Sequence, residues 1–233
     1  MKFNKKKVLV TSVAIILVAI LSFSTLAWFS DADEVTNKFM VAGSEDKNPD
    51  EVFSVDVWEK LDKDGDGQPD DEKDHDGNTY ENVLPGGTYV KEPHVQNSGA
   101  YDQYVRVKVT VSDAAAWMEI LGSYSITDLT TIFKGYDDSL WIRLDEPAYD
   151  EEADTLTYVY YLEKILKPGE DVTLFTHVVI PGVLTQNDLA KVGGSFELTI
   201  VAEAVQTENV GSNALEAFQT VEASGQEIDQ IKP

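Results

Sequence analysis

The sequence predicts an all-β protein, an antiparallel β-sandwich with short helices in the connections. In residues 104–111, valines alternate with Tyr, Arg, Lys and Thr, which is the pattern of a strand with one buried face. Several other short segments are rich in β-branched and aromatic residues, and Gly, Pro and acidic turns separate them. The sequence has no helical periodicity long enough for a bundle, and no alternation of strands with helices that would indicate a parallel sheet.

The individual elements follow from local patterns. Strands are expected at residues 39–42, 52–59, 104–111, 140–144, 155–162, 172–180 and 196–206, with 172–180 as a single strand. We expect a helix over 114–121 with Asp113 as its N-cap, one helical turn within 185–192, and a helix near 213–222. The sandwich domain is predicted over residues 28–206, and residues 207–233 are predicted to be a polar C-terminal tail.

Residues 1–27 have the pattern of a secretory signal peptide. Four lysines precede an uncharged run over residues 8–29, and the small residues Thr25 and Ala27 place the cleavage after Ala27. The alternative is an uncleaved membrane anchor, because the run is just long enough to span a bilayer. In either case the rest of the chain lies outside the cytoplasm, and any membrane contact is made through the uncleaved leader.

Composition excludes some partners. Cleavage removes four lysines and no acidic residue, which leaves 14 basic against 42 acidic residues and a formal charge of −28. Such a surface repels nucleic acid and anionic lipid and suits an extracellular protein that binds cations. The chain has no cysteine. A secreted domain without disulfides is held together by its core, by a metal ion or by its neighbours.

Residues 61–78 form an acidic, glycine-rich loop with the residue types of a calcium site. Ca²⁺ takes six to eight oxygen ligands, and aspartates at every second position followed by Gly let several carboxylates converge. The pattern departs from an EF-hand, because Lys73 stands where a bidentate Glu is expected and no helical pattern flanks the loop. We expect a structural Ca²⁺ staple rather than a switch, and the alternative is a solvated loop without an ion. The predicted ligands are Asp62, Asp64, Asp66, Gln68, Asp70, Asp74 and Asp76.

The sequence favours a protein that is not an enzyme. A zinc protease of the HExxH type needs two histidines one helical turn apart, whereas His75, His94 and His177 are far apart and begin no such motif. We expect His94 in a turn and His177 in a strand. No G-x-S-x-G motif is present either.

Two positive residues and five tyrosines leave one binding alternative open. They form either an aromatic surface for carbohydrate or, as we expect, ordinary cross-strand pairs. These residues are Arg106, Lys108, Tyr101, Tyr104, Tyr158, Tyr160 and Tyr161.

Several motifs, taken in order, resemble one family of secreted proteins from Gram-positive bacteria, the TasA/camelysin family. The motifs are LAWFSD at 26–31, NKFMVAG at 37–43, LPG at 84–86, HVQNSG at 94–99, YVRV at 104–107, YVYY at 158–161, LKPGE at 166–170 and AEAVQ at 202–206.

The resemblance implies a jelly-roll-like sandwich, export through a SipW-type signal peptidase, and a role in the cell surface or biofilm matrix. It also implies self-association or assembly with related matrix proteins, including fibres. We expect the segment 28–42 to act as the assembly element. The alternative is that residues 39–42 pair within their own domain. Some relatives are described as camelysin metalloproteases, so an extracellular metalloendopeptidase is the alternative function.

Overall fold

The computed structural model describes residues 53–60, 73–75, 77–144, 146–193 and 195–225. In this part of the chain the strands lie in three sheets, their pairings are antiparallel, and the helices are few and short. The predicted all-β class is therefore confirmed. The strand expected at 39–42, the leader and most of the acidic loop lie outside the described residues.

The largest sheet has five strands, in the order β12-β5-β9-β7 with β8 also paired to β9. The second sheet has the order β10-β4-β1-β2, and the third has the order β3-β11-β6. The strands are β1 (Val55–Lys60), β2 (Lys73–Asp74), β3 (Thr88–Val90), β4 (His94–Asn97), β5 (Gln103–Ser112), β6 (Phe133–Lys134), β7 (Trp141–Arg143), β8 (Ala148–Asp150), β9 (Thr155–Leu162), β10 (Asp171–Thr173), β11 (His177–Val179) and β12 (Leu198–Gln206).

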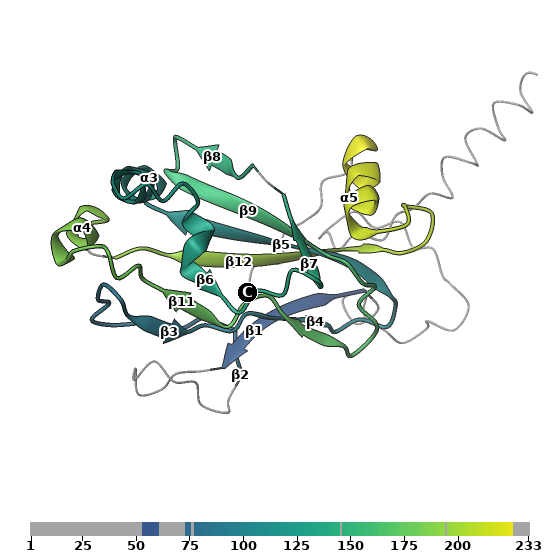
Figure 1. Ribbon diagram of the computed structural model, residues 1–233. Helices are drawn as coiled ribbons and strands as arrows, with labels where there is room; N and C mark the ends of the chain where they lie inside the picture. Colours follow the sequence, from purple (N-terminus) through teal and green to yellow (C-terminus); the bar gives the residue numbers. More distant parts are fainter. Residues whose placement is uncertain (1–52, 61–72, 76, 145, 194, 226–233) are drawn as a thin grey trace, which may run out of the picture.

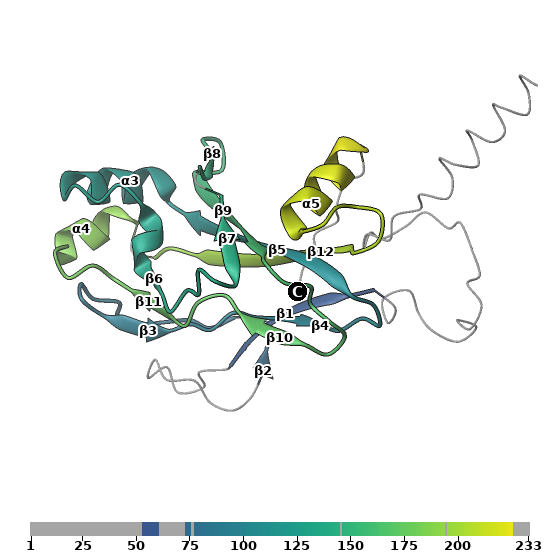
Figure 2. The same ribbon diagram turned by 45° about the vertical axis from the view of Figure 1, so that its right-hand side comes forward.

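The five-stranded sheet lies over the two smaller sheets, as both views show (Figures 1 and 2). Helices α3 (Ala114–Ser123) and α4 (Gln186–Lys191) lie together at one end, and helix α5 (Ala214–Ala223) lies toward the other. A short 3-10 helix, η1 (Leu129–Ile132), precedes β6. The main hydrophobic core takes side chains from all three sheets and from α3.

Strand β5 organises the core as the sequence predicts. Val105, Val107, Val109 and Val111 are all fully buried on the inner face of the five-stranded sheet. The strand pairs along nearly its whole length with β12 on one side and β9 on the other. β9 has the predicted bounds, and β12 begins two residues later than expected.

The single strand predicted over 172–180 is wrong. This segment forms two strands in different sheets, β10 paired with β4 and β11 paired with β3 and β6. Leu174 and Phe175 lie between them and are both buried, so two consecutive side chains enter the core. A flat strand cannot bury consecutive side chains on one face, because they alternate. The chain therefore changes sheets at this point.

The helix predicted over 114–121 is present, but Asp113 does not cap it. The Asp113 side chain makes no capping hydrogen bond and instead accepts one from the Ser112 hydroxyl at 2.6 Å. Asp154, in the turn between β8 and β9, replaces it: its Oδ1 accepts from the amide of Ala115 at 2.9 Å, and its backbone carbonyl accepts from the amide of Ala114 at 3.1 Å. The acceptor is 39 residues away in the sequence, so local patterns could not identify it.

The segment predicted as a polar tail contains helix α5, which packs on the outer face of the five-stranded sheet. A second, smaller hydrophobic cluster forms there from Tyr104, Tyr161, Val205, Val210, Ala214, Ala217, Phe218 and Val221. The Arg106 guanidinium lies 4.4 Å from the Phe218 ring, and its Nη1 is 2.5 Å from Glu222 Oε1. Arg106 also pairs with Glu203, whose other oxygen is 2.6 Å from Lys108 Nζ. Burial acts to lower the pKa of Arg106, but Glu203 and Glu222 outweigh it, so the pKa is raised.

Phe218→Ala should lower the free energy of unfolding by about 3 kcal/mol, because a fully buried ring is removed and a cavity is left. Urea denaturation measures this loss. Leu84→Ala, at a side chain that is 56% exposed, is the control and should change stability by less than about 0.5 kcal/mol. Equal stability of Phe218→Ala and the wild type would contradict the packing of α5 on the sheet.

Helix α4 begins with a reciprocal cap. The Thr185 hydroxyl accepts from the Asp188 amide at 3.2 Å, and the Asp188 carboxylate accepts from the Thr185 amide at 2.9 Å. The hydrogen bonds from Thr185, and one from the Tyr124 hydroxyl, lower the pKa of Asp188 to about 2. A depressed pKa means that the ionised carboxylate stabilises the folded state above the ordinary pKa near 4. This contribution is lost as the pH falls toward 2.

We therefore expect Asp188→Asn to have a lower Tm than the wild type at pH 7. The difference should persist down to about pH 4 and shrink between pH 4 and pH 2, as the wild-type carboxylate becomes protonated. Thermal unfolding of both proteins across this pH range measures the effect. A difference in Tm that is independent of pH would show that the charge of Asp188 is not involved.

Candidate functional site

The predicted calcium loop joins two paired strands. Asp62, Asp64, Asp66, Gln68, Asp70 and Asp76 lie outside the described residues, and Asp74 is placed in β2. The ladder between β1 and β2 pairs Glu59 with Asp74 and Lys60 with Lys73, so the two ends of segment 61–72 are held side by side. The acidic segment is thus the connection of a β-hairpin, closed at its base.

The chain that leaves the loop is attached to β1 by side chains. His75 Nδ1 lies 3.1 Å from the Val57 carbonyl oxygen and 3.4 Å from Asp56 Oδ1. The Asn78 side-chain amide donates to the Lys60 carbonyl at 2.8 Å. Together with the ladder, these contacts attach the chain that follows the acidic segment to β1, the strand that precedes it.

The outer face of the second sheet carries an aromatic stack beside this base. Trp58 of β1 and His94 of β4 are partners in the ladder, and their rings stack 4.0 Å apart with an angle of 7° between them. Lys73 of β2 lies over the other face of the Trp58 ring, 3.9 Å from its centroid. The stack therefore joins β2, β1 and β4, with a cation on the electron-rich face of the indole.

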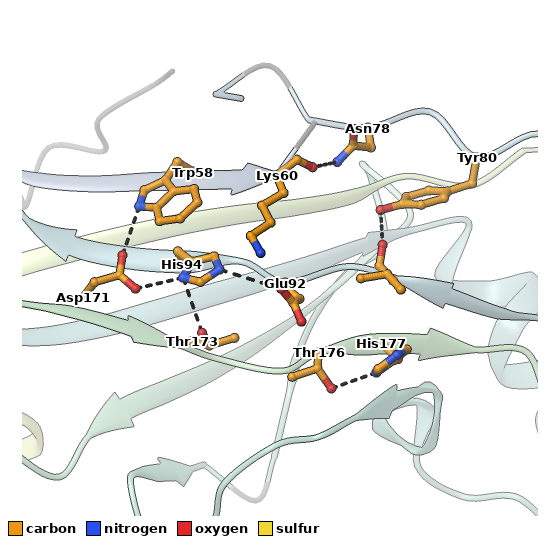
Figure 3. A network of polar contacts seen from close by, with 11 residues as sticks. Trp58, Lys60, Asn78, Tyr80, Glu92, His94, Asp171, Thr173, Thr176 and His177 are labelled. Atoms are coloured by element: carbon orange, nitrogen blue, oxygen red, sulfur yellow. Dashed lines mark hydrogen bonds and ion pairs between the residues drawn. The ribbon is translucent and has the colours of Figure 1, made fainter. Parts of the chain in front are cut away.

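Asp171 of β10 binds both stacked rings (Figure 3). Its Oδ2 accepts from the Trp58 indole at 3.0 Å, and its Oδ1 lies 2.8 Å from His94 Nδ1. His94 Nε2 is shielded from solvent, lies 4.0 Å from Glu92 Oε2, and has no hydrogen-bond partner among the described residues. A carboxylate on Nδ1 orients an imidazole, as in hydrolase triads. Here the second ring nitrogen faces the protein, so the arrangement holds β1, β4 and β10 together.

The three histidines lie in different surroundings. The prediction that His94 is a turn residue is wrong, because it lies in β4; His177 lies in β11 as expected, with its Nδ1 2.8 Å from the Thr176 hydroxyl. His75 follows β2. Within the described ranges, no group of three or more His, Asp or Glu side chains is arranged to hold a metal ion.

A buried ion pair lies on the inner side of β1. Lys91 Nζ is 2.5 Å from Glu59 Oε1, and both side chains are only 8% exposed. The other oxygen, Glu59 Oε2, is buried and makes no hydrogen bond to any residue that the structure describes. Since a buried charge is costly without its partner, each of these two residues depends on the other.

The aromatic surface considered for carbohydrate does not form. Tyr104, Tyr158, Tyr160 and Tyr161 are all buried, and only Tyr101 is exposed. Burial raises the pKa of Tyr158 to about 12 and raises that of Tyr160 as well. The four buried tyrosines belong to the two hydrophobic clusters.

Sequence reasoning missed Trp58, Glu59, Lys91 and Asp171. One local signal was present, because the alternation of β1 places Val55, Val57 and then Glu59 on the inner face. A carboxylate at an inner position indicates a buried partner. Its partner, Lys91, lies in the connection between β3 and β4, and Trp58 stacks on His94 through the pairing of β1 with β4. The local pattern specifies neither partner.

Comparisons with family models, with curated proteins and with solved structures give no match. Among the helices of the described residues, none has the length and hydropathy needed to cross a membrane.

Removing one partner of the buried ion pair should be far more costly than removing both. Lys91→Met should lower the free energy of unfolding by about 3–5 kcal/mol, because it leaves Glu59 buried and unpaired. Adding Glu59→Leu should recover most of this loss. Urea denaturation of the single and double variants measures both values.

The exposed pair of Lys164 and Glu170, 3.5 Å apart, is the matched control. Lys164→Met should cost no more than about 1 kcal/mol, since exposed ion pairs contribute little. If Lys91→Met costs as little as Lys164→Met, the Glu59–Lys91 pair is not desolvated.

Proposed function

We propose that the chain is a secreted structural protein of the cell surface or biofilm matrix, with a calcium-binding loop that acts as a structural staple. The observation that supports the calcium proposal is the closed base of segment 61–72: the ladder between β1 and β2 holds the two ends of this Asp-rich connection side by side. In this proposal the described sheets form a jelly-roll-like β-sandwich, and the calcium ligands come from Asp62, Asp64, Asp66, Gln68, Asp70, Asp74 and Asp76.

The need for such a staple follows from the size of β2. This strand has only two residues, and a hairpin with so short a ladder is marginally stable by itself. The connection is also long and strongly acidic, so closing it costs chain entropy and brings like charges together. A bound Ca²⁺ would offset both costs by drawing the carboxylates together.

The structural role rests on composition and on the resemblance. The formal charge of the mature chain and the lack of cysteine suit an extracellular protein stabilised by its core and by cations. Export would pass through a SipW-type signal peptidase. Self-association, or association with related matrix proteins, would use the strands that end each sheet order, such as β12 and β7, because outer strands are templates for added strands.

We expect millimolar Ca²⁺ to raise the Tm of the wild type, because an ion that binds only the folded state stabilises it by mass action. At about ten times the Kd this stabilisation is about 1.4 kcal/mol, or a few degrees in Tm. Asp64→Ala with Asp66→Ala should abolish the rise. Thermal unfolding with Ca²⁺ or with a chelator measures it.

The matched control is Asp102→Ala with Asp138→Ala, which removes two exposed aspartates elsewhere in the chain and should keep the response to Ca²⁺. An equal rise in the loop variant and the wild type would mean that the acidic segment is only solvated. Hydrolysis of casein by the purified protein, abolished by chelator and by His94→Ala, would instead support the metalloendopeptidase.

A further inference from the structure

An apolar strip lies on the outer face of the five-stranded sheet, beside helix α5. We define this outer strip by Ile142, Leu144, Val159 and Val201. The ladders place Val201 and Val159 on either side of Lys108, and the Leu144 amide donates to the Val159 carbonyl at 3.0 Å. Ile142 is 44% exposed and Leu144 is 37% exposed, and the two valines are half buried.

Helix α5 covers the row of side chains next to this strip. In that row Arg106 pairs across the ladders with Glu203 and Tyr161, and Phe218 of the helix lies on both Arg106 and Tyr161. Arg106 and Lys108 are two residues apart on one face of β5, which corresponds to about 7 Å. Lys108, Val159, Val201 and Leu144 therefore lie in the next row along the sheet, whereas Ile142 pairs with Tyr161 at the end of the covered row. Val159 also packs against the edge of the cluster beneath α5, so the strip borders the helix.

The described chain ends close to this strip. Glu222, in the last turn of α5, makes an ion pair with Arg106 at 2.5 Å, and Gly225 follows three residues later. The following segment, 226–233, has the sequence QEIDQIKP. Eight residues reach up to about 26 Å when extended, several times the distance between neighbouring rows.

The chemistry of this segment matches the strip. Ile228 and Ile231 are its two large apolar residues, and Glu227 and Asp229 flank Ile228. The strip has apolar side chains on both sides of Lys108, whose ammonium group is already paired with Glu203 at 2.6 Å. Two isoleucines can cover these apolar side chains, so the match between segment and strip is apolar.

We propose that segment 226–233 binds over the outer strip, with Ile228 and Ile231 against Leu144 and Val159. In this proposal the outer strip is a docking surface for segment 226–233 of the same chain.

The lack of cysteine in the chain allows a direct test by chemical labelling. Leu144→Cys introduces one thiol into the strip, and its rate of reaction with a maleimide is measured in the full chain at low protein concentration. We expect labelling to be about tenfold faster when Ile228→Ser and Ile231→Ser are added, which corresponds to about 1.4 kcal/mol of lost protection. Gln226→Ser with Gln230→Ser changes the same segment without removing apolar side chains and should leave the rate unchanged.

A thiol at Leu84→Cys, in the turn before β3, controls for a general loss of structure and should react equally in both backgrounds. Equal labelling of Leu144→Cys with and without the two isoleucines would overturn the proposal. Labelling that slows as the protein concentration rises would overturn it too, because a second copy would then cover the strip.

Discussion

The burial of both faces of β5 is the constraint on which the rest of this structure depends. Its valines fill the inner core, and its other face carries Tyr104 and Arg106, which are buried as well. A strand with two buried faces needs a cover on each side, since apolar area must leave water on both. The two smaller sheets supply the inner cover together with α3, and helix α5 supplies part of the outer one.

This double burial also explains the placement of positive charge. The chain has few basic residues, and several of them are used inside the fold rather than on its surface. Arg106 and Lys108 share Glu203 on the outer face of the five-stranded sheet, and Lys91 pairs with Glu59 beneath β1. Each of these pairs joins segments far apart in the sequence. Because an unpaired charge at such a position is costly, the pairs also disfavour other strand registers.

Beside the acidic loop, on the outer face of the second sheet, a charged side chain again joins segments that are far apart in the sequence. Asp171 binds Trp58 and His94 at once, and Lys73 lies on the other face of the indole. Four strands thus meet at the base of an acidic connection, with β2 the shortest of them. On the side of the loop itself, the base consists of the two residue pairs between β1 and β2.

By itself, the sequence determined the all-β class, the strands β5 and β9, the short helices and the acidic composition of segment 61–72. These features depend on alternation, turn residues and charge, which act over a few neighbouring residues. The tertiary structure alone decided the split of 172–180 into two sheets, the capping of α3 by Asp154 instead of Asp113, and the position of His94 in a strand. It also decided the pairing of Glu59 with Lys91 and the packing of α5. Each of these depends on residues that the tertiary fold brings together from distant parts of the sequence, and a local pattern carries no information about which distant segment will supply the partner.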